Sequence, residues 1–171
     1  MSRTLFSNII RFIVLIPVQV LVLDNINLGG FVNPYLYVIF ILMLPLEIAG
    51  WALLFLSFLM GLGIDMFSGT PGMHAAASTL MAFVRPLVIK SVGISRDIDP
   101  GMEPSIPSMG FSWFFMYALI LVFIHHLALF TIEVFRLEGL FSVFLRTLYS
   151  TLLTLALIIV LQYLFGRSSR K

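Results

Sequence analysis

Two adjacent histidines, His125 and His126, are the residues whose types and spacing come nearest to a metal site. Neighbouring residues on a helix point about 100° apart, and Glu133 lies seven residues beyond His126, roughly 10 Å along the helix axis. One ion cannot be held by these three side chains alone, and a site would need ligands from other segments, such as His74 or Asp65. Because three or four converging ligands are usually needed, we predict no metal site and expect the two histidines to form hydrogen bonds between helices.

The familiar catalytic and cofactor-binding motifs are missing from the sequence. It contains no G-x-S-x-G, H-E-x-x-H, Walker A or G-x-G-x-x-G pattern. It also has no Cys, which excludes disulfides, thiolate metal ligands and a cysteine nucleophile. The pair Gly61 and Gly63 is too short for a phosphate loop and favours a close approach of two helices. We therefore expect no catalytic residues and no cofactor, in a protein that is not an enzyme.

The composition indicates a protein that lies in a lipid bilayer. Of the 171 residues, 60% are hydrophobic and 11% are charged, whereas soluble domains have about 45–50% apolar and about 25% charged residues. The formal net charge is only +2, so we expect no nucleic-acid partner. The length suits one domain, and we predict a single integral membrane domain over residues 1–171.

Apolar runs separated by polar turns predict an all-α membrane protein, a six-transmembrane-helix bundle. A spanning helix needs about 20 mostly apolar residues, and the runs cover 4–23, 31–46, 48–64, 73–92, 112–135 and 140–165. The second run is short and ends at Pro45-Leu46-Glu47, so the second and third runs form either a helical hairpin or one long bent helix. A chain with five spans is therefore the competing topology. The Pro- and Gly-rich stretch 93–111 predicts a loop.

Lysine and arginine in short loops mark the cytoplasmic side of a membrane. With six spans both termini lie on one side, and the basic residues divide six to one: Arg3, Lys90, Arg96, Arg167, Arg170 and Lys171 against Arg136. This asymmetry predicts cytoplasmic termini and a cytoplasmic loop 93–111. The loop is acidic, with Asp97, Asp99 and Glu103 beside Arg96, and is either a solvated linker or a docking strip for a partner.

Charged residues inside spans are costly, so each needs a partner or a task. Toward the predicted cytoplasmic side lie Arg11, Glu47 and Arg85. Glu47 is at a level where it can pair with Arg11 or with Arg85. We favour structural pairing, with a substrate or ion pathway as the alternative.

A second layer of charge lies toward the predicted outer side. Glu133 and Arg136 are three residues apart on one helix and can pair directly. Arg146 lies two turns into the last span and can meet Glu133 or Asp65. A structural clamp is again the favoured interpretation.

The most distinctive stretch is 61–75, GLGIDMFSGTPGMHA, where one apolar helix ends and a helix rich in small residues begins. We expect Asp65 to accept hydrogen bonds from backbone N–H groups of the turn or of the next helix. We expect Thr70 to be the N-cap of that helix and Pro71 its first residue. The junction is either a structural corner or a partner-binding surface, and its candidate residues are Asp65, Phe67, Ser68, Gly69, Pro71, Gly72 and His74.

The order G-x-x-x-D followed by F-S-G-x-P-G-x-H-A resembles the MreD family of bacterial rod shape-determining proteins. The specific match covers residues 61–75, and the size, hydropathy and six-span layout of the chain agree with it. The resemblance implies a non-enzymatic scaffold in the bacterial inner (cytoplasmic) membrane that binds MreC. Through MreC it implies a link to the actin-like MreB and to RodA with its penicillin-binding transpeptidase, which build lateral peptidoglycan.

The same resemblance supplies the alternative function. MreD-like folds are similar to the substrate-binding subunits of energy-coupling-factor transporters, which implies a small-solute-binding membrane subunit. The intramembrane charges could then line a cavity.

Overall fold

The computed structural model describes residues 2–26, 31–94, 99–134 and 140–165. All regular structure in these ranges is helical, which agrees with the all-α prediction. Five helices of the described chain are long and apolar enough to cross a membrane, so the protein is a multi-pass helical membrane protein. They are α1 (Ser2–Pro17) with its continuation η1 (Val18–Leu23), α3 (Gly50–Ser68), α4 (Met73–Val92), α6 (Phe111–Val134) and α7 (Leu140–Phe165).

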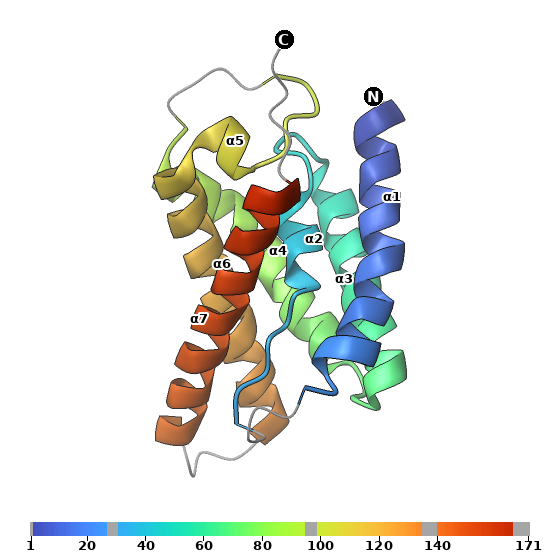
Figure 1. The fold of residues 1–171 in the computed structure, drawn as a ribbon, viewed down its shortest axis with the longest axis vertical. Helices are drawn as coiled ribbons and strands as arrows, with labels where there is room; N and C mark the ends of the chain where they lie inside the picture. The colour runs from blue at the N-terminus through green and yellow to red at the C-terminus, as the bar shows by residue number, and fades with distance from the viewer. Residues whose placement is uncertain (1, 27–30, 95–98, 135–139, 166–171) are drawn as a thin grey trace.

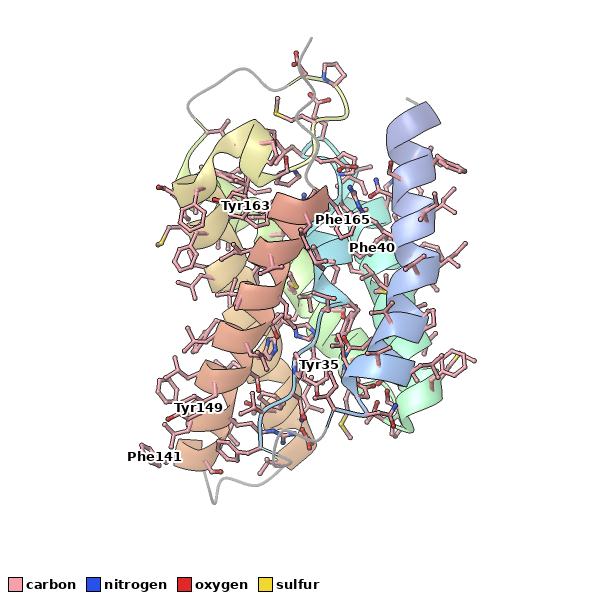
Figure 2. The ribbon with its side chains drawn as sticks, in the orientation of Figure 1. Tyr35, Phe40, Phe141, Tyr149, Tyr163 and Phe165 are labelled. Atoms are coloured by element: carbon pink, nitrogen blue, oxygen red, sulfur yellow. The ribbon has the colours of Figure 1, made fainter. Side chains whose placement is uncertain are left out.

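The long helices run side by side and pack on one another in chain order, α3 on α4, α4 on α6 and α6 on α7. Figure 1 shows the start of α1 and the end of α7 at the same end of the bundle. We name this the α5 end, after the short helix α5 (Ile106–Met109) that lies there, and name the opposite end the Asp65 end. Figure 2 shows Tyr35 and Phe40 inside the bundle, whereas Phe141, Tyr149, Tyr163 and Phe165 extend outward from α7.

The expected spanning helix over 31–46 is wrong. Residues 32–35 have no regular structure, 36–37 form a turn, and the helix α2 (Val38–Met43) is only six residues long. This stretch runs through the middle of the bundle from the Asp65 end to the α5 end (Figure 1), and all of residues 34–44 are buried. We call residues 31–46 the inner segment.

The apolar character of the inner segment has a different physical cause from that of the long helices. A spanning helix is apolar because it faces lipid, whereas residues 34–44 of this segment are apolar because they are enclosed by protein. Irregular backbone is tolerated at membrane depth only where other parts of the protein satisfy its N–H and C=O groups. The inner segment therefore depends on side chains of the surrounding helices.

The turn between α3 and α4 also differs from the expectation. α3 ends at Gly69 with a φ of 67°, and α4 begins at Met73 after Gly72, whose φ is 81°. Both angles are in the left-handed region that glycine enters at no steric cost. Thr70 is therefore not the N-cap and Pro71 is not in the helix, because the chain is still turning at Gly72. The hydroxyl of Thr70 instead donates to Asp65 at 2.8 Å.

The predicted loop 93–111 contains the one-turn helix α5 in its described part. Ser105 caps this helix through its side chain, and the hydroxyl of Ser108 accepts a hydrogen bond from the Ser105 backbone N–H. The backbone N–H of Leu46 donates to the Met102 carbonyl at 2.9 Å, so this region is fastened to the end of the inner segment. The predicted basic tail 166–171 and Arg136 lie outside the described residues.

Candidate functional site

The junction 61–75 is organised by the carboxylate of Asp65, which is only 5% exposed. Oδ1 accepts hydrogen bonds from Thr70 Oγ1 at 2.8 Å and from the backbone N–H of His74 at 3.0 Å. Oδ2 accepts one from the backbone N–H of Ala75 at 2.9 Å. The first N–H groups of a helix have no partner within it, and here a residue of α3 supplies the partner. This agrees with the capping that the sequence led us to expect.

Behind this cap, α3 and α4 touch through their backbones. A Cβ atom added at Gly61 would overlap the carbonyl of His74 and the Cα of Ala75. A Cβ at Gly63 would lie 2.8 Å from the side chain of Ile16 on α1. Two small residues of the sequence pattern therefore set the spacing of α3 against both neighbours, as the Gly61–Gly63 pair predicted.

The rest of the motif faces outward. The Phe67 side chain is 67% exposed, and Pro71 and Gly72 are also exposed. Ser68 is exposed and donates to Asp24 Oδ2 at 3.1 Å, which links the end of α3 to the end of η1. The motif thus has a buried half that builds the corner and an exposed half that is free to meet another molecule.

His74 and His125 meet at a hydroxyl that the sequence did not indicate. Tyr37 Oη lies 2.9 Å from His74 Nδ1 and 2.7 Å from His125 Nε2. All three side chains are buried, and they come from the inner segment, α4 and α6. The expectation that His125 forms hydrogen bonds between helices was therefore right in kind, but its partner is on the inner segment.

His126 is also fully buried, and it points toward α7. Its Nδ1 lies 2.8 Å from the Val122 carbonyl of its own helix, and its Nε2 lies 3.3 Å from Thr154 Oγ1. The ring of Tyr35 packs near it, with 5.4 Å between the ring centres. This hydrogen bond between α6 and α7 is the interaction predicted for a histidine in a span.

Polar side chains of α7 and of η1 satisfy the backbone of the inner segment. The N–H groups of Asn33 and Tyr35 donate to Ser150 Oγ and Thr154 Oγ1, each at 3.1 Å. Gln19 contributes most. Its Oε1 accepts from the N–H of Leu36 at 2.8 Å, and its Nε2 donates to the Pro34 carbonyl at 2.9 Å and to Asp24 Oδ1 at 2.7 Å. Pro17 precedes Gln19 and has no N–H to donate, and the wider π-helical turn η1 follows it.

Arg85 holds the other end of the inner segment. Its side chain is 1% exposed, and its guanidinium donates to the carbonyls of Leu44 and Pro45. Nε donates to Tyr117 Oη at 2.7 Å. A cation at the carboxyl end of a helix offsets the partial negative charge of the free carbonyls there. The predicted pairing of Arg85 or Arg11 with Glu47 is wrong, because Glu47 is exposed and Arg85 caps α2.

The remaining predicted charges form ion pairs. Arg11 Nη2 lies 2.8 Å from Glu103 Oε2, so its partner is in the acidic loop and not on a span. Arg146 Nη1 lies 2.9 Å from Glu133 Oε2, which agrees with one of the two partners expected for Arg146. The Arg146 guanidinium also lies 4.2 Å from the centre of the Phe130 ring. Both pairs join separate segments near the two ends of the bundle.

A hollow of about 360 Å³ opens at the Asp65 end, beside the junction. The residues that line it are Val20, Asp24, Asn25, Asn33, Tyr35, Phe67, Ser68, Thr70 and His74. It therefore joins the end of η1, the start of the inner segment and the turn between α3 and α4. The polar groups of three separate segments converge there.

Within the described residues, no group of three or more His, Asp or Glu side chains is placed to hold a metal ion. The interior instead offers hydrogen-bonding groups that hold the inner segment, together with the polar hollow at one end. Comparisons with protein-family models, with curated proteins and with solved structures found no match for this chain.

Proposed function

We propose that the chain is an MreD-like, non-enzymatic scaffold of the bacterial cell-elongation complex in the inner membrane. In this proposal it binds MreC, is linked through MreC to MreB, and helps to organise RodA and its penicillin-binding transpeptidase during lateral peptidoglycan synthesis. The observation that carries the proposal is the junction 61–75, whose sequence resembles that family. Its exposed half, Phe67 to Gly72, leaves side chains available to a partner.

The proposed topology has six crossings, with the inner segment as the second. The start of α1 and the end of α7 lie at the same end of the bundle, which supports an even number of crossings. Six of the loop and terminal basic residues fall on that side of the proposed topology against one on the other. We therefore assign the α5 end to the cytoplasm.

The absence of Cys allows the topology to be tested by single substitutions. Ser68→Cys and Ser91→Cys place one thiol at each end of the bundle. Both serines are exposed; Ser68 is the last residue of α3, and Ser91 is the last but one of α4. A membrane-impermeant maleimide should label Ser68→Cys in intact spheroplasts and Ser91→Cys only after lysis. The reverse pattern would refute the assignment of the α5 end to the cytoplasm.

The scaffold function is tested by purifying the tagged chain in nanodiscs from its native membrane and identifying the bound proteins by mass spectrometry. We expect recovery of MreC and RodA-type synthase components, and rounding of rod-shaped cells when the chain is depleted. Recovery of an ATPase-coupled transporter module in their place would favour the solute-binding alternative. Normal shape and normal lateral wall growth after complete depletion would exclude the scaffold.

A pair of matched variants tests the junction itself. Phe67→Ala removes an aromatic side chain that is 67% exposed at the junction, and Phe83→Ala removes one that is 71% exposed on α4. Neither change empties a buried site, so both variants should remain folded. We expect Phe67→Ala to reduce MreC recovery and Phe83→Ala to leave it unchanged. Equal recovery with both variants would show that the exposed half of the junction does not bind MreC.

A further inference from the structure

We propose that the hollow at the Asp65 end binds one sugar-sized polyhydroxyl group. Ligand pockets in proteins are usually about 300–1,000 Å³, and this hollow, of about 360 Å³, is at the small end of that range. It can hold a single saccharide ring and not an extended chain. The ring belongs either to a free sugar or to the headgroup of a glycolipid, which share the same chemistry.

The lining matches the two faces of a sugar ring. Each sugar hydroxyl can donate a hydrogen bond. The hydroxyls of Ser68 and Thr70 donate to carboxylates, and the amide nitrogen of Asn25 donates to backbone carbonyls, so the oxygens of these side chains remain to accept from a sugar. The C–H face of a sugar ring is apolar, and the Phe67 ring at the edge of the hollow offers an aromatic surface of matching character.

The floor of the hollow is preorganised by buried polar side chains. His74 is only 4% exposed, and Tyr37 holds its ring through Nδ1. His74 also lines the hollow. Tyr35, at 8% exposure, lines the same floor. The rings of Tyr35 and His74 pack edge to face, with 5.1 Å between their centres, so the floor is held in place before a ligand binds.

The charge of the lining narrows the ligand class. Among the described lining residues, Asp24 is the one with a formal charge, and a carboxylate accepts hydrogen bonds but repels anions. The site should therefore take neutral or amine-bearing sugars and reject sugar acids. Replacing Asp24 with Asn keeps an oxygen that can accept the hydrogen bond from Gln19 and removes the charge.

The test is saturation-transfer NMR on the full chain in nanodiscs, with N-acetylglucosamine, glucosamine and glucuronate as probes. We expect saturable signals from the first two and none from glucuronate. Asp24→Asn should let glucuronate bind. Absence of binding by all three sugars at millimolar concentration, or equal binding of all three to the wild-type chain, would overturn the proposal.

Two variants on the same turn of α3 locate the binding. Ser68→Trp fills the hollow, whereas Met66→Trp enlarges a side chain that is 76% exposed and does not line it. We expect Ser68→Trp to weaken binding about tenfold or more, the effect of losing one or two hydrogen bonds, and Met66→Trp to bind as the wild type does. Equal binding by the two variants would overturn the assignment to this hollow.

Nanodiscs made with monoglucosyl diacylglycerol distinguish the two sources of the sugar. Competition by the glycolipid against N-acetylglucosamine would identify a lipid headgroup, and its absence would identify a free sugar. The proposal does not depend on the scaffold function. Sugar binding without MreC recovery would refute only the scaffold, and MreC recovery without sugar binding would refute only this site.

Discussion

Oxygen Oδ2 of Asp65 accepts a hydrogen bond from the backbone N–H of Ala75 at 2.9 Å, so the last turn of α3 caps the first turn of α4. An N-cap residue usually lies immediately before its helix. Here the capping carboxylate lies eight positions before Met73, the first residue of α4, and the same carboxylate closes the intervening turn through Thr70. The corner is therefore one hydrogen-bonded unit, and its stability should depend strongly on one side chain.

Replacement of Asp65 by Ala should destabilise this corner. The change leaves the buried N–H groups of His74 and Ala75 without partners, and we expect a loss of about 2–4 kcal/mol, from the cost of removing a cap and of unpaired buried groups. Asp65→Asn keeps one acceptor and should lose about half as much. Thermal unfolding in detergent measures both, and an Asp65→Ala chain as stable as the wild type would contradict the prediction.

The backbone contact at Gly61 predicts that a single added methyl group there lowers the free energy of unfolding strongly. In Gly61→Ala the new Cβ meets the His74 carbonyl, so α3 and α4 must separate, and we expect a loss of about 1–3 kcal/mol or more. Gly50→Ala is the control, because nothing lies within 4 Å of a Cβ there and Ala favours a helix. Thermal unfolding of the two variants side by side gives the comparison. A similar stability for both would mean that the helices do not touch at Gly61.

Gln19 should contribute more to the stability of the inner segment than its position in an apolar run suggests. Gln19→Leu has a similar volume but leaves the Leu36 N–H and the Pro34 carbonyl unpaired, at about 1–3 kcal/mol for each group. Thr131→Val is the control, since the Thr131 hydroxyl donates to the Leu127 carbonyl of its own helix and lies away from the inner segment in sequence. Hydrogen exchange at Leu36 should accelerate in Gln19→Leu and stay unchanged in Thr131→Val. Unchanged exchange in both would refute the assigned role of Gln19.

The ion pair of Arg146 and Glu133 should contribute little to the free energy of unfolding. The side chains are 18% and 40% exposed, respectively, and pairs in contact with solvent typically contribute about 0.2–1 kcal/mol. A double-mutant cycle with Arg146→Gln and Glu133→Gln should therefore give a coupling below about 1 kcal/mol. Arg146→Gln alone should cost more than the coupling, because it also loses the contact with Phe130. A coupling above about 2 kcal/mol would contradict this assignment.

Most of the long helices could be predicted from sequence, because crossing a bilayer requires both their length and their apolar content. The predicted runs 73–92 and 140–165 coincide with α4 and α7, and 112–135 differs from α6 by one residue at each end. Each run faces lipid or a neighbouring helix over about the thickness of a bilayer. The glycines and prolines that separate the runs fix where each can end.

The inner segment could not be recognised in the same way, because hydropathy does not distinguish burial in protein from burial in lipid. Two signals were available: the run of 31–46 is short for a span, and Pro34 and Pro45 lie near its ends. The partners of Gln19 and Arg85 on the inner segment are backbone groups, which look alike at every position in a sequence. No pattern of residue types could have assigned them, although a lone amide within an apolar run marks Gln19 as unusual.

The hydrogen bonds of the inner segment also impose an order on the biosynthesis of the chain. The N–H groups of Asn33 and Tyr35 bond to residues 117 and 119 positions later, on α7, which leaves the ribosome after all the other described helices. Until α7 is in the membrane, those groups have no partner in the part of the native fold that already exists, and an irregular backbone cannot rest in lipid. The inner segment is therefore completed only after α7 is in place, and a chain truncated before α7 should fail quality control even though its first five apolar runs are intact.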